Sequence, residues 1–492
     1  MSNKQFLSKV RNAYGVEWNY DTNVWTRLGL ARGMVRANFD TVEPWLSHKR
    51  CTIADAKTIN HYFGEGGYLE DGSDGQVMVY QKLCYMAVEY IKSPNRYRWW
   101  ISPYPFEGSF IHPNFIRDSV LKTHIFAGAY EASAYVVGSV ATVRTLEVTA
   151  GCSVTGNITI TMDGTPVVIA VTDTDDATEV ATIIRGTVFT GWTLSGSGTT
   201  VIFTSDAVGY RGGTYIFDGS TTGVTATIAN TTMGEPGYLN NDESGIDFTA
   251  TTGDKLSSIA LVKPISGKNN TLNFANARKL AVNRGVGWGL HDFLSLSVSQ
   301  LMYLIEYASP FAQTEIGQGV TGETDDGSTN MAHVTGATTA LGNASGRQTG
   351  TDNLCSVSYR GLENLWGNIM KFVEGINKKS DETVWLADHG FVCDTFAHPY
   401  IKLRDTIAQY NNFFGLPMRS PNHPGFLPVF TEGGGTKIGD SYRTVLGSQG
   451  ILLKGAPKSW NPTTNEGLFA YTTESVSSTY ERWIGCRLMA IP

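Results

Sequence analysis

Between Val140 and Gly237 the chain contains no lysine, although lysine and arginine together number 38 in the whole sequence. This stretch is rich in Thr, Val, Ile and Gly. Its three basic and nine acidic residues give it a charge of −6, which is nearly all of the chain's net charge of −7. A change of composition this sharp is typical of a domain boundary, so we predict that residues 140–237 form an inserted acidic domain within a larger body.

Local patterns inside residues 140–237 predict a small module of strands with one helix. Asp163-Gly164 is a hairpin turn signal between two strand-like segments. Asp175 or Asp176 is placed to cap a short helix, with Glu179 at the capping-box position. The strands expected are 157–162, 167–171, 192–194, 201–203 and 224–228.

Composition limits the classes of function. A chain of 492 residues with 41% hydrophobic residues is long enough for two or three domains with real cores. Its low charged content of 17%, with 54 Gly and 55 aromatic residues (22 Tyr, 22 Phe and 11 Trp), suits a secreted or virion protein better than a metabolic enzyme. The net negative charge and the lack of a Lys/Arg run argue against a nucleic-acid partner.

Features that the sequence lacks bear on where the protein is expected to be made and located. There is no apolar leader after Met1 and no run of about 18 apolar residues, so we expect neither a secretion signal nor membrane insertion. The six cysteines (Cys51, Cys84, Cys152, Cys355, Cys393 and Cys486) are scattered without a C-x-x-C pair. We expect buried free thiols, no zinc site, and synthesis in a reducing host cytoplasm.

We expect the segments on either side of residues 140–237 to fold together as one body. Apolar residues recur at three- and four-residue steps from Asp292 to Tyr307, which predicts a core helix, and a second helix is expected around Phe274–Val282. Residues 318–352 are rich in Gly, Thr and Asn without periodicity and predict a long irregular loop. From Tyr359 onward the chain reads as short strands separated by turns.

Several motifs occur in order across residues 1–139 and 238–492. They are Ile111-His112-Pro113-Asn114-Phe115, Phe126-Ala127-Gly128-Ala129-Tyr130-Glu131, Arg284-Gly285-Val286-Gly287-Trp288, Ser358 to Asn368, and Ile484-Gly485-Cys486-Arg487-Leu488. This series resembles the signatures of phage tail-fibre and receptor-binding proteins with a C-type-lectin-like fold. The wider family includes the major tropism determinant and the formylglycine-generating enzyme.

The resemblance implies an α+β fold class, with a C-type-lectin-like body and an inserted, β-rich, sandwich-like α+β module. Residues 1–50 would serve attachment or oligomerisation, 51–139 with 238–492 would form the body, and 140–237 would form the insert. Such a protein sits in the virion as a homotrimer, attaches to other tail proteins, and displays C-terminal loops to a glycan or protein receptor on the host. Diversification of these loops by a retroelement is a hypothesis that the same resemblance raises.

The C-terminal tail supplies the predicted receptor-binding residues, because rigid aromatic side chains mixed with short polar ones suit recognition. The alternative is that half of the aromatic side chains there lie in the core. The residues predicted to bind the receptor are Trp460, Asn461, Asn465, Tyr471, Ser475, Ser478, Tyr480 and Arg482.

The sequence gives little support for other functions. A formylglycine-generating enzyme needs a pair of metal-binding cysteines near the C-terminus, whereas Cys486 has no partner nearby. His389, His398 and His423 lack metal-site spacing, and no calcium-lectin tripeptide occurs. We therefore predict no catalytic residue, cofactor or metal. The competing function is a structural decoration, tail or baseplate component that binds no receptor; a depolymerase ranks third, because it would need a repetitive β-scaffold.

Overall fold

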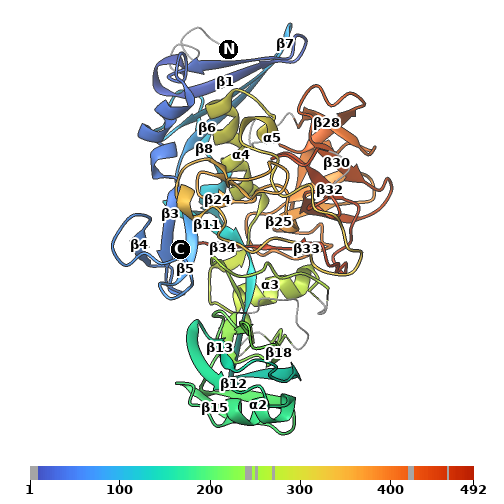
Figure 1. Ribbon diagram of the computed structural model, residues 1–492. Helices are drawn as coiled ribbons and strands as arrows, with labels where there is room; N and C mark the ends of the chain where they lie inside the picture. Colours follow the sequence, from blue (N-terminus) through green and yellow to red (C-terminus); the bar gives the residue numbers. More distant parts are fainter. Residues whose placement is uncertain (1–8, 239–245, 250–252, 269–271, 419–425, 462–464) are drawn as a thin grey trace. The chain divides into compact units, whose positions relative to one another are not determined.

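The computed structural model describes residues 9–238, 246–249, 253–268, 272–418, 426–461 and 465–492 (Figure 1). The chain divides into two compact units. One, here called the body, consists of residues 1–134 and 239–492, and the other, here called the insert unit, is Tyr135–Tyr238. From the sequence we placed the insert at 140–237, a stretch that lies within the observed insert unit.

The expected α+β fold class is wrong. Strands make up 39% of the structure and helices 12%, with many antiparallel sheets and a half-barrel, and nothing in this architecture supports the C-type-lectin-like body. The error has a physical cause. The short strands expected from Tyr359 onward are present, but strands such as β25 (Met370–Lys378) and β31 (Gly450–Lys454) are buried along their whole length, so no alternation of apolar and polar residues marks their bounds or the extent of the sheet.

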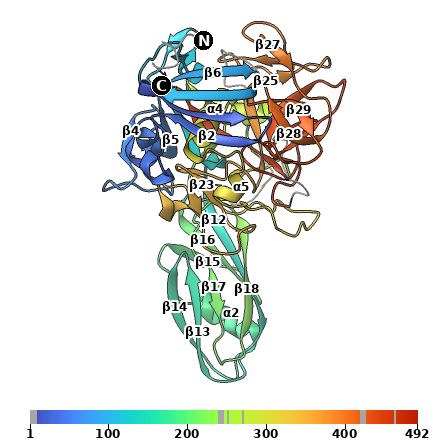
Figure 2. The same cartoon turned by 90° about the horizontal axis from the view of Figure 1, so that it is seen from above.

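An antiparallel five-stranded sheet begins the body, in the order β2-β1-β7-β6-β8. Its strands are β1 (Tyr14–Asn19), β2 (Val24–Gly29), β6 (Tyr85–Lys92), β7 (Asn95–Ser102) and β8 (Phe110–Ile111) (Figure 2). The indole ring of Trp25 stacks between those of Trp18 and Trp99, with centroid distances of 5.1 and 5.8 Å. Trp18 and Trp45, which we assigned to an attachment region, are fully buried in the body's main core.

A second sheet pairs strands from the first third of the chain with the last strand. It has the order β21-β34-β11-β5-β3-β4, with the C-terminal strand β34 between β21 and β11. Its strands are β3 (Lys49–Ile53), β4 (Ile59–Tyr62), β5 (Gln76–Lys82), β11 (His124–Glu131), β21 (Trp288–Leu290) and β34 (Arg487–Ala490). Two of the motifs found in the sequence, 126–131 and 484–488, therefore contribute neighbouring strands.

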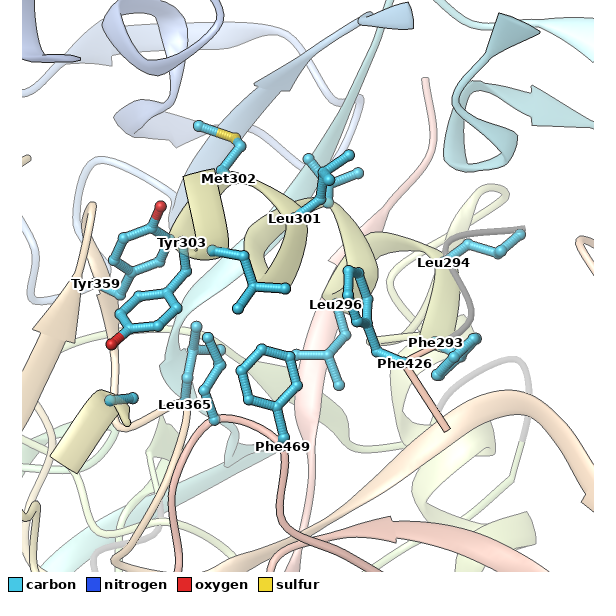
Figure 3. Close-up of a cluster of buried hydrophobic side chains, with 14 of the residues drawn as sticks. Phe293, Leu294, Leu296, Leu301, Met302, Tyr303, Tyr359, Leu365, Phe426 and Phe469 are labelled. Carbon is cyan, nitrogen blue, oxygen red and sulfur yellow. The ribbon is translucent and has the colours of Figure 1, made fainter. Parts of the chain in front are cut away.

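The helix α4 (Phe293–Tyr307) lies at the centre of the body, and every one of its residues is buried. Asp292 caps its N-terminus by accepting a hydrogen bond from the Ser295 amide at 2.7 Å, and Ala308 ends it in the left-handed conformation. Figure 3 shows its side chains among residues from distant segments, including Tyr359, Leu365, Phe426 and Phe469. The predicted core helix is confirmed, and so is the second helix, α3 (Phe274–Val282).

The C-terminal part forms a nine-stranded sheet with the path β27-β26-β25-β31-β32-β30-β28-β29, and β33 pairs with β25 beside that path. Its remaining strands are β26 (Thr383–Leu386), β27 (Ile401–Thr406), β28 (Asn412–Pro417), β29 (Pro428–Glu432), β30 (Ser441–Thr444), β32 (Tyr471–Thr473) and β33 (Ile484–Gly485). The two ends of the path approach each other, because the Ala408 amide just after β27 donates to the Pro428 carbonyl at the start of β29, at 2.8 Å. This meeting of β27 and β29 is here called the seam.

Short elements complete the body. They are η1 (Arg36–Thr41), η2 (Trp45–Ser47), η3 (Pro113–Phe115), β9 (Ile116–Arg117), β10 (Val120–Leu121), β20 (Lys255–Ser257), α5 (Ala312–Glu315), η4 (Thr339–Leu341), β22 (Gly346–Arg347), β23 (Val357–Tyr359) and β24 (Leu362–Glu363). Most of residues 318–352 have no regular structure, as predicted.

The insert unit has a core of its own, built from apolar side chains of two sheets and one helix. The helix α2 (Ala177–Arg185) starts at Asp176, which forms a capping box with Glu179, as predicted. The predicted hairpin is confirmed as β13 and β14, paired around Asp163-Gly164. The unit's strands are β12 (Ser133–Ala150), β13 (Gly156–Met162), β14 (Thr165–Val171), β15 (Trp192–Ser195), β16 (Thr200–Val208), β17 (Ile216–Asp218), β18 (Thr225–Thr232) and β19 (Glu235–Tyr238).

Candidate functional site

The aromatic residues that we predicted to bind a receptor are mostly buried. Trp460 and Tyr471 have no exposed surface, whereas Tyr480 is 54% exposed. The Tyr471 hydroxyl accepts a hydrogen bond from Gln300 of α4 at 2.7 Å, and burial raises its pKa above the ordinary value. Tyr471 is thus part of the scaffold that surrounds α4, and of these three side chains Tyr480 alone is presented to solvent.

Arg482 and Trp460 come together in an ion-pair cluster with Asp325 and Lys458. The Arg482 guanidinium donates to both oxygens of Asp325, at 2.6 and 2.8 Å, and lies 5.5 Å from the Trp460 ring. Lys458 binds the same carboxylate at 2.6 Å. Burial acts to raise the pKa of Asp325, but the hydrogen bonds from Lys458 and Arg482 outweigh it and lower that pKa to about 2. The cluster holds the C-terminal tail against the irregular loop 318–352, which is a structural role.

The other predicted recognition residues are more accessible. Asn461, Asn465 and Ser478 are exposed, and Ser475 is half-buried. The Asn465 side chain donates to the Gly439 carbonyl at 3.0 Å, so its amide is already engaged. Pro462, Thr463 and Thr464, which belong to the same predicted tail, lie outside the described residues.

A groove suited to a ligand lies at the seam of the nine-stranded sheet, in a part of the body that the sequence did not single out. It has a volume of about 700 Å³ and is open to solvent. Its lining residues come from β7, β27, β28 and β29 and the turn after β1, and they are Tyr20, Asn95, Tyr97, Arg404, Asp405, Thr406, Leu416, Val429 and Phe430. We call this cavity the seam groove; Figure 2 labels β27, β28 and β29.

The chain forms this groove because its sheet ends there. β27 pairs on one side with β26, and β29 pairs on one side with β28, so the two strands present their outer edges where they meet. Sheet edges are recognition surfaces unless they are covered. Phe430 on β29 is 52% exposed, so part of its ring is accessible to a ligand in the groove.

Polar side chains add directional groups to these apolar walls. Arg404 is exposed and makes no ion pair within the described ranges of the chain, and the Asp405 carboxylate follows it directly. Asn95 is held in place, because its amide oxygen accepts from the Tyr90 hydroxyl and its amide nitrogen donates to Asp21, both at 2.9 Å. The arrangement is that of a binding site, with apolar surface and a few fixed polar groups.

A second cavity of about 460 Å³ lies near two of the histidines noted in the sequence. His389 binds Asp388 through Nδ1 at 2.5 Å and Asp118 through Nε2 at 3.3 Å, and its ring lies 6.2 Å from that of His398. His423 lies outside the described residues. No group of three or more His, Cys, Asp or Glu side chains in the described ranges is arranged to hold a metal ion.

All six cysteines are free, and every one except Cys393 is buried, so the predicted free thiols are confirmed. Burial raises the pKa of Cys51, Cys84 and Cys486 above the ordinary thiol value. Such thiols are poor nucleophiles.

The motifs behind the family resemblance form a buried polar network. Arg487 donates to the carbonyl oxygens of Gly128 and Ala129, at 2.7 and 3.0 Å, and Glu131 pairs with Lys371 at 2.6 Å. Asn364 also binds Glu131, at 3.4 Å. These residues support the body, and none of them lines the seam groove.

Comparison with known proteins adds no family to this description. No protein-family model matches the chain, and no curated protein matches it. Among the described residues, no helix is both long enough and apolar enough to cross a membrane.

Proposed function

We propose that this chain is a receptor-binding protein of a phage tail, and that it contacts the host through the seam groove. In this proposal it acts in adsorption without catalysing a reaction, sits in the virion as a homotrimer, and attaches to other tail proteins. The observation that carries the proposal is the groove itself, where exposed aromatic and apolar surface meets Arg404, Asp405 and Asn95. The composition and the ordered motifs support the phage assignment as a resemblance only.

The lining of the groove favours binding over hydrolysis. Hydrolysis of a glycosidic bond ordinarily uses two carboxyl groups on either side of the bond. Among the described residues that line the groove, Asp405 is the one carboxylate. A rigid rim of aromatic and hydrogen-bonding side chains without a catalytic pair is typical of a recognition surface.

Binding to whole cells tests the proposal. The purified, fluorescently labelled full chain is mixed with a panel of bacterial strains that differ in their surface polysaccharides, and bound protein is measured by flow cytometry. We expect binding to at least one strain and a loss of about tenfold or more for Phe430→Ala and Arg404→Ala. Both side chains are exposed, so these variants keep the fold.

Tyr410→Ala is the matched control. Its side chain is 69% exposed in the connection between β27 and β28, yet it does not line the groove, so the variant should bind like the wild type. Absence of wild-type binding to every strain would contradict the proposal and favour a structural decoration, tail or baseplate component. Equal binding by all variants would contradict the assignment to the groove.

A further inference from the structure

We propose that the cavity beside His389 and His398 binds a small amphipathic amine, a molecule with an apolar ring or chain and a protonated amino group. This cavity, here called the histidine cavity, shares no lining residue with the seam groove, and the inference does not depend on the proposed receptor-binding function. Its basis is a set of apolar walls that meet a histidine held between two carboxylates.

The apolar walls of the histidine cavity come from segments far apart in the sequence. They include Phe110 and Ile111 of β8, Leu294 of α4, Leu386 of β26 and Ile401 of β27. Leu294 and Leu386 belong to the main core, whereas Ile401 is 53% exposed. The volume of about 460 Å³ lies within the range of about 300–1,000 Å³ that is usual for small-ligand sites. An apolar group that enters the cavity would remove part of these surfaces from water.

The polar part of the lining is centred on His389. Its Nδ1 lies 2.5 Å from Asp388, and its Nε2 lies 3.3 Å from Asp118, which precedes the lining residue Ser119 in the turn between β9 and β10. Two carboxylates outnumber one imidazole, so the three groups carry a net negative charge whether His389 is neutral or protonated. Their side chains are between 30% and 76% exposed, so a ligand can reach them.

The buried Arg117 guanidinium next to the lining does not cancel this charge. It donates to the backbone carbonyl of Asp388 at 3.1 Å, but its charge is paired with the carboxylate of Asp292, and both side chains are at most 3% exposed. Among the described residues that line the cavity, none is Lys or Arg. A carboxylate-bearing ligand would therefore meet like charge.

A protonated amine with an apolar body matches both parts of the lining. An ammonium group donates up to three hydrogen bonds, and such bonds to a carboxylate are stronger than those between neutral groups. Asp388 can accept one, because its Oδ2 receives no hydrogen bond from the described residues. A neutral apolar molecule would use the walls alone, so charge complementarity favours the amine.

Three probes that share one apolar body and differ in the head group test the proposal. They are 2-phenylethylamine, 2-phenylethanol and 3-phenylpropanoate, titrated against the full chain at about pH 8, where an alkylamine is still protonated. Saturation-transfer NMR measures the dissociation constants. We expect the amine to bind at least about tenfold more tightly than the carboxylate, with the alcohol between them.

Two variants assign the binding to the histidine cavity. Asp388→Asn keeps the shape of the side chain and should weaken the amine about tenfold, while changing the alcohol less than about twofold. Ile401→Ala should weaken all three probes by a similar factor, because it removes part of a shared wall. Asp71→Asn is the matched control, since Asp71 is exposed and lines neither the histidine cavity nor the seam groove. Equal melting temperatures show that the variants remain folded.

Three results would overturn the inference. If 3-phenylpropanoate binds as tightly as 2-phenylethylamine, the carboxylates do not select the ligand. If the amine binds equally to the wild type, Asp388→Asn and Ile401→Ala, it binds elsewhere on the protein. If none of the probes binds at concentrations up to about 10 mM, the cavity is not a site for this class of ligand.

Discussion

The body and the insert unit are held together by different physical means. The insert unit has an apolar core, and no Asp, Glu, Lys or Arg side chain described in it is buried. The body instead buries complete ionic groups around its apolar core, among them Arg50, Glu131 and Arg487. The stability of the insert unit therefore comes from burial of apolar side chains. The stability of the body also depends on ionic side chains whose partners lie far apart in the sequence.

This difference shows where each unit is sensitive to change. A buried charge whose partner is removed costs far more than a lost surface pair, because the remaining groups cannot be hydrated. An apolar core loses stability in proportion to the volume removed. The body should therefore tolerate few substitutions at its charged centre, while the insert unit should respond gradually and on its own.

The largest expected effect is at Arg487, which contacts the carbonyl oxygens of Gly128, Ala129 and Asn364. Arg487→Met should destabilise the body by about 3–5 kcal/mol, since those oxygens and the nearby carboxylates lose their cation. Urea unfolding of the full chain, followed by tryptophan fluorescence, measures this change. The exposed Arg32→Met should alter stability by less than about 0.5 kcal/mol, and equal effects at the two arginines would contradict the distinction.

An apolar truncation in the insert unit should come next. Ile160 is fully buried on β13, so Ile160→Ala should cost about 2–5 kcal/mol. Hydrogen exchange followed by mass spectrometry should show faster exchange confined to Tyr135–Tyr238, because this unit has its own core. Equally accelerated exchange in α4 would mean that the two units unfold as one.

The pH dependence of stability tests the role of buried ionic groups in the body. Burial raises the pKa of Glu466 to about 7 and that of Asp440 to about 6, and lowers that of Lys454 to about 8. A carboxyl with a raised folded-state pKa binds its proton more tightly than the unfolded chain does. Its contribution to stability therefore falls as pH rises from about 4.5 to about 7.

Glu466→Gln removes that contribution while keeping the side chain's shape. The melting temperature of the variant minus that of the wild type should rise across this interval. Taking the difference cancels the opposite trend from His48 and His291, whose pKa values burial lowers to about 3. A difference that falls with rising pH would show that the ionised Glu466 stabilises the body.

The smallest effect concerns the helix cap of the insert unit. The Asp176 carboxylate accepts hydrogen bonds from the amides of Thr178 and Glu179, at 2.8 and 2.9 Å. Asp176→Ala should cost about 0.5–2 kcal/mol, and Glu179→Gln, which keeps the capping box, should cost less. Exchange rates in α2 provide the measurement, and a larger loss in Glu179→Gln would contradict the role of the cap.

The same contrast explains what the sequence could and could not predict. In the insert unit, the Asp163-Gly164 hairpin and the helix start at Asp176 are local signals, and both are confirmed. In the body, α4 was predictable from its periodicity, but its surroundings were not. Short strands were expected in this region, but β25 buries Lys371 and Glu374 beside apolar residues, so no alternation marks where it begins and ends or which strands it pairs with.

The candidate site could not be predicted from the sequence, for a related reason. Tyr20, Asn95, Arg404 and Phe430 come from separate segments, and they meet only where the first sheet and the seam of the nine-stranded sheet line one groove. The aromatic residues of the C-terminal tail looked like a recognition surface, yet Trp460 and Tyr471 proved to be core residues. Composition cannot distinguish an aromatic side chain that faces solvent from one that fills a core.

One measurement tests most directly whether the body binds its receptor through the seam groove. Hydrogen exchange of the full chain is followed with and without purified envelope fragments from a strain that binds it. We predict slower exchange on binding in β27 and β29, residues 401–406 and 428–432, with the insert unit unchanged. Slower exchange limited to residues 475–482, or to the insert unit, would contradict the account.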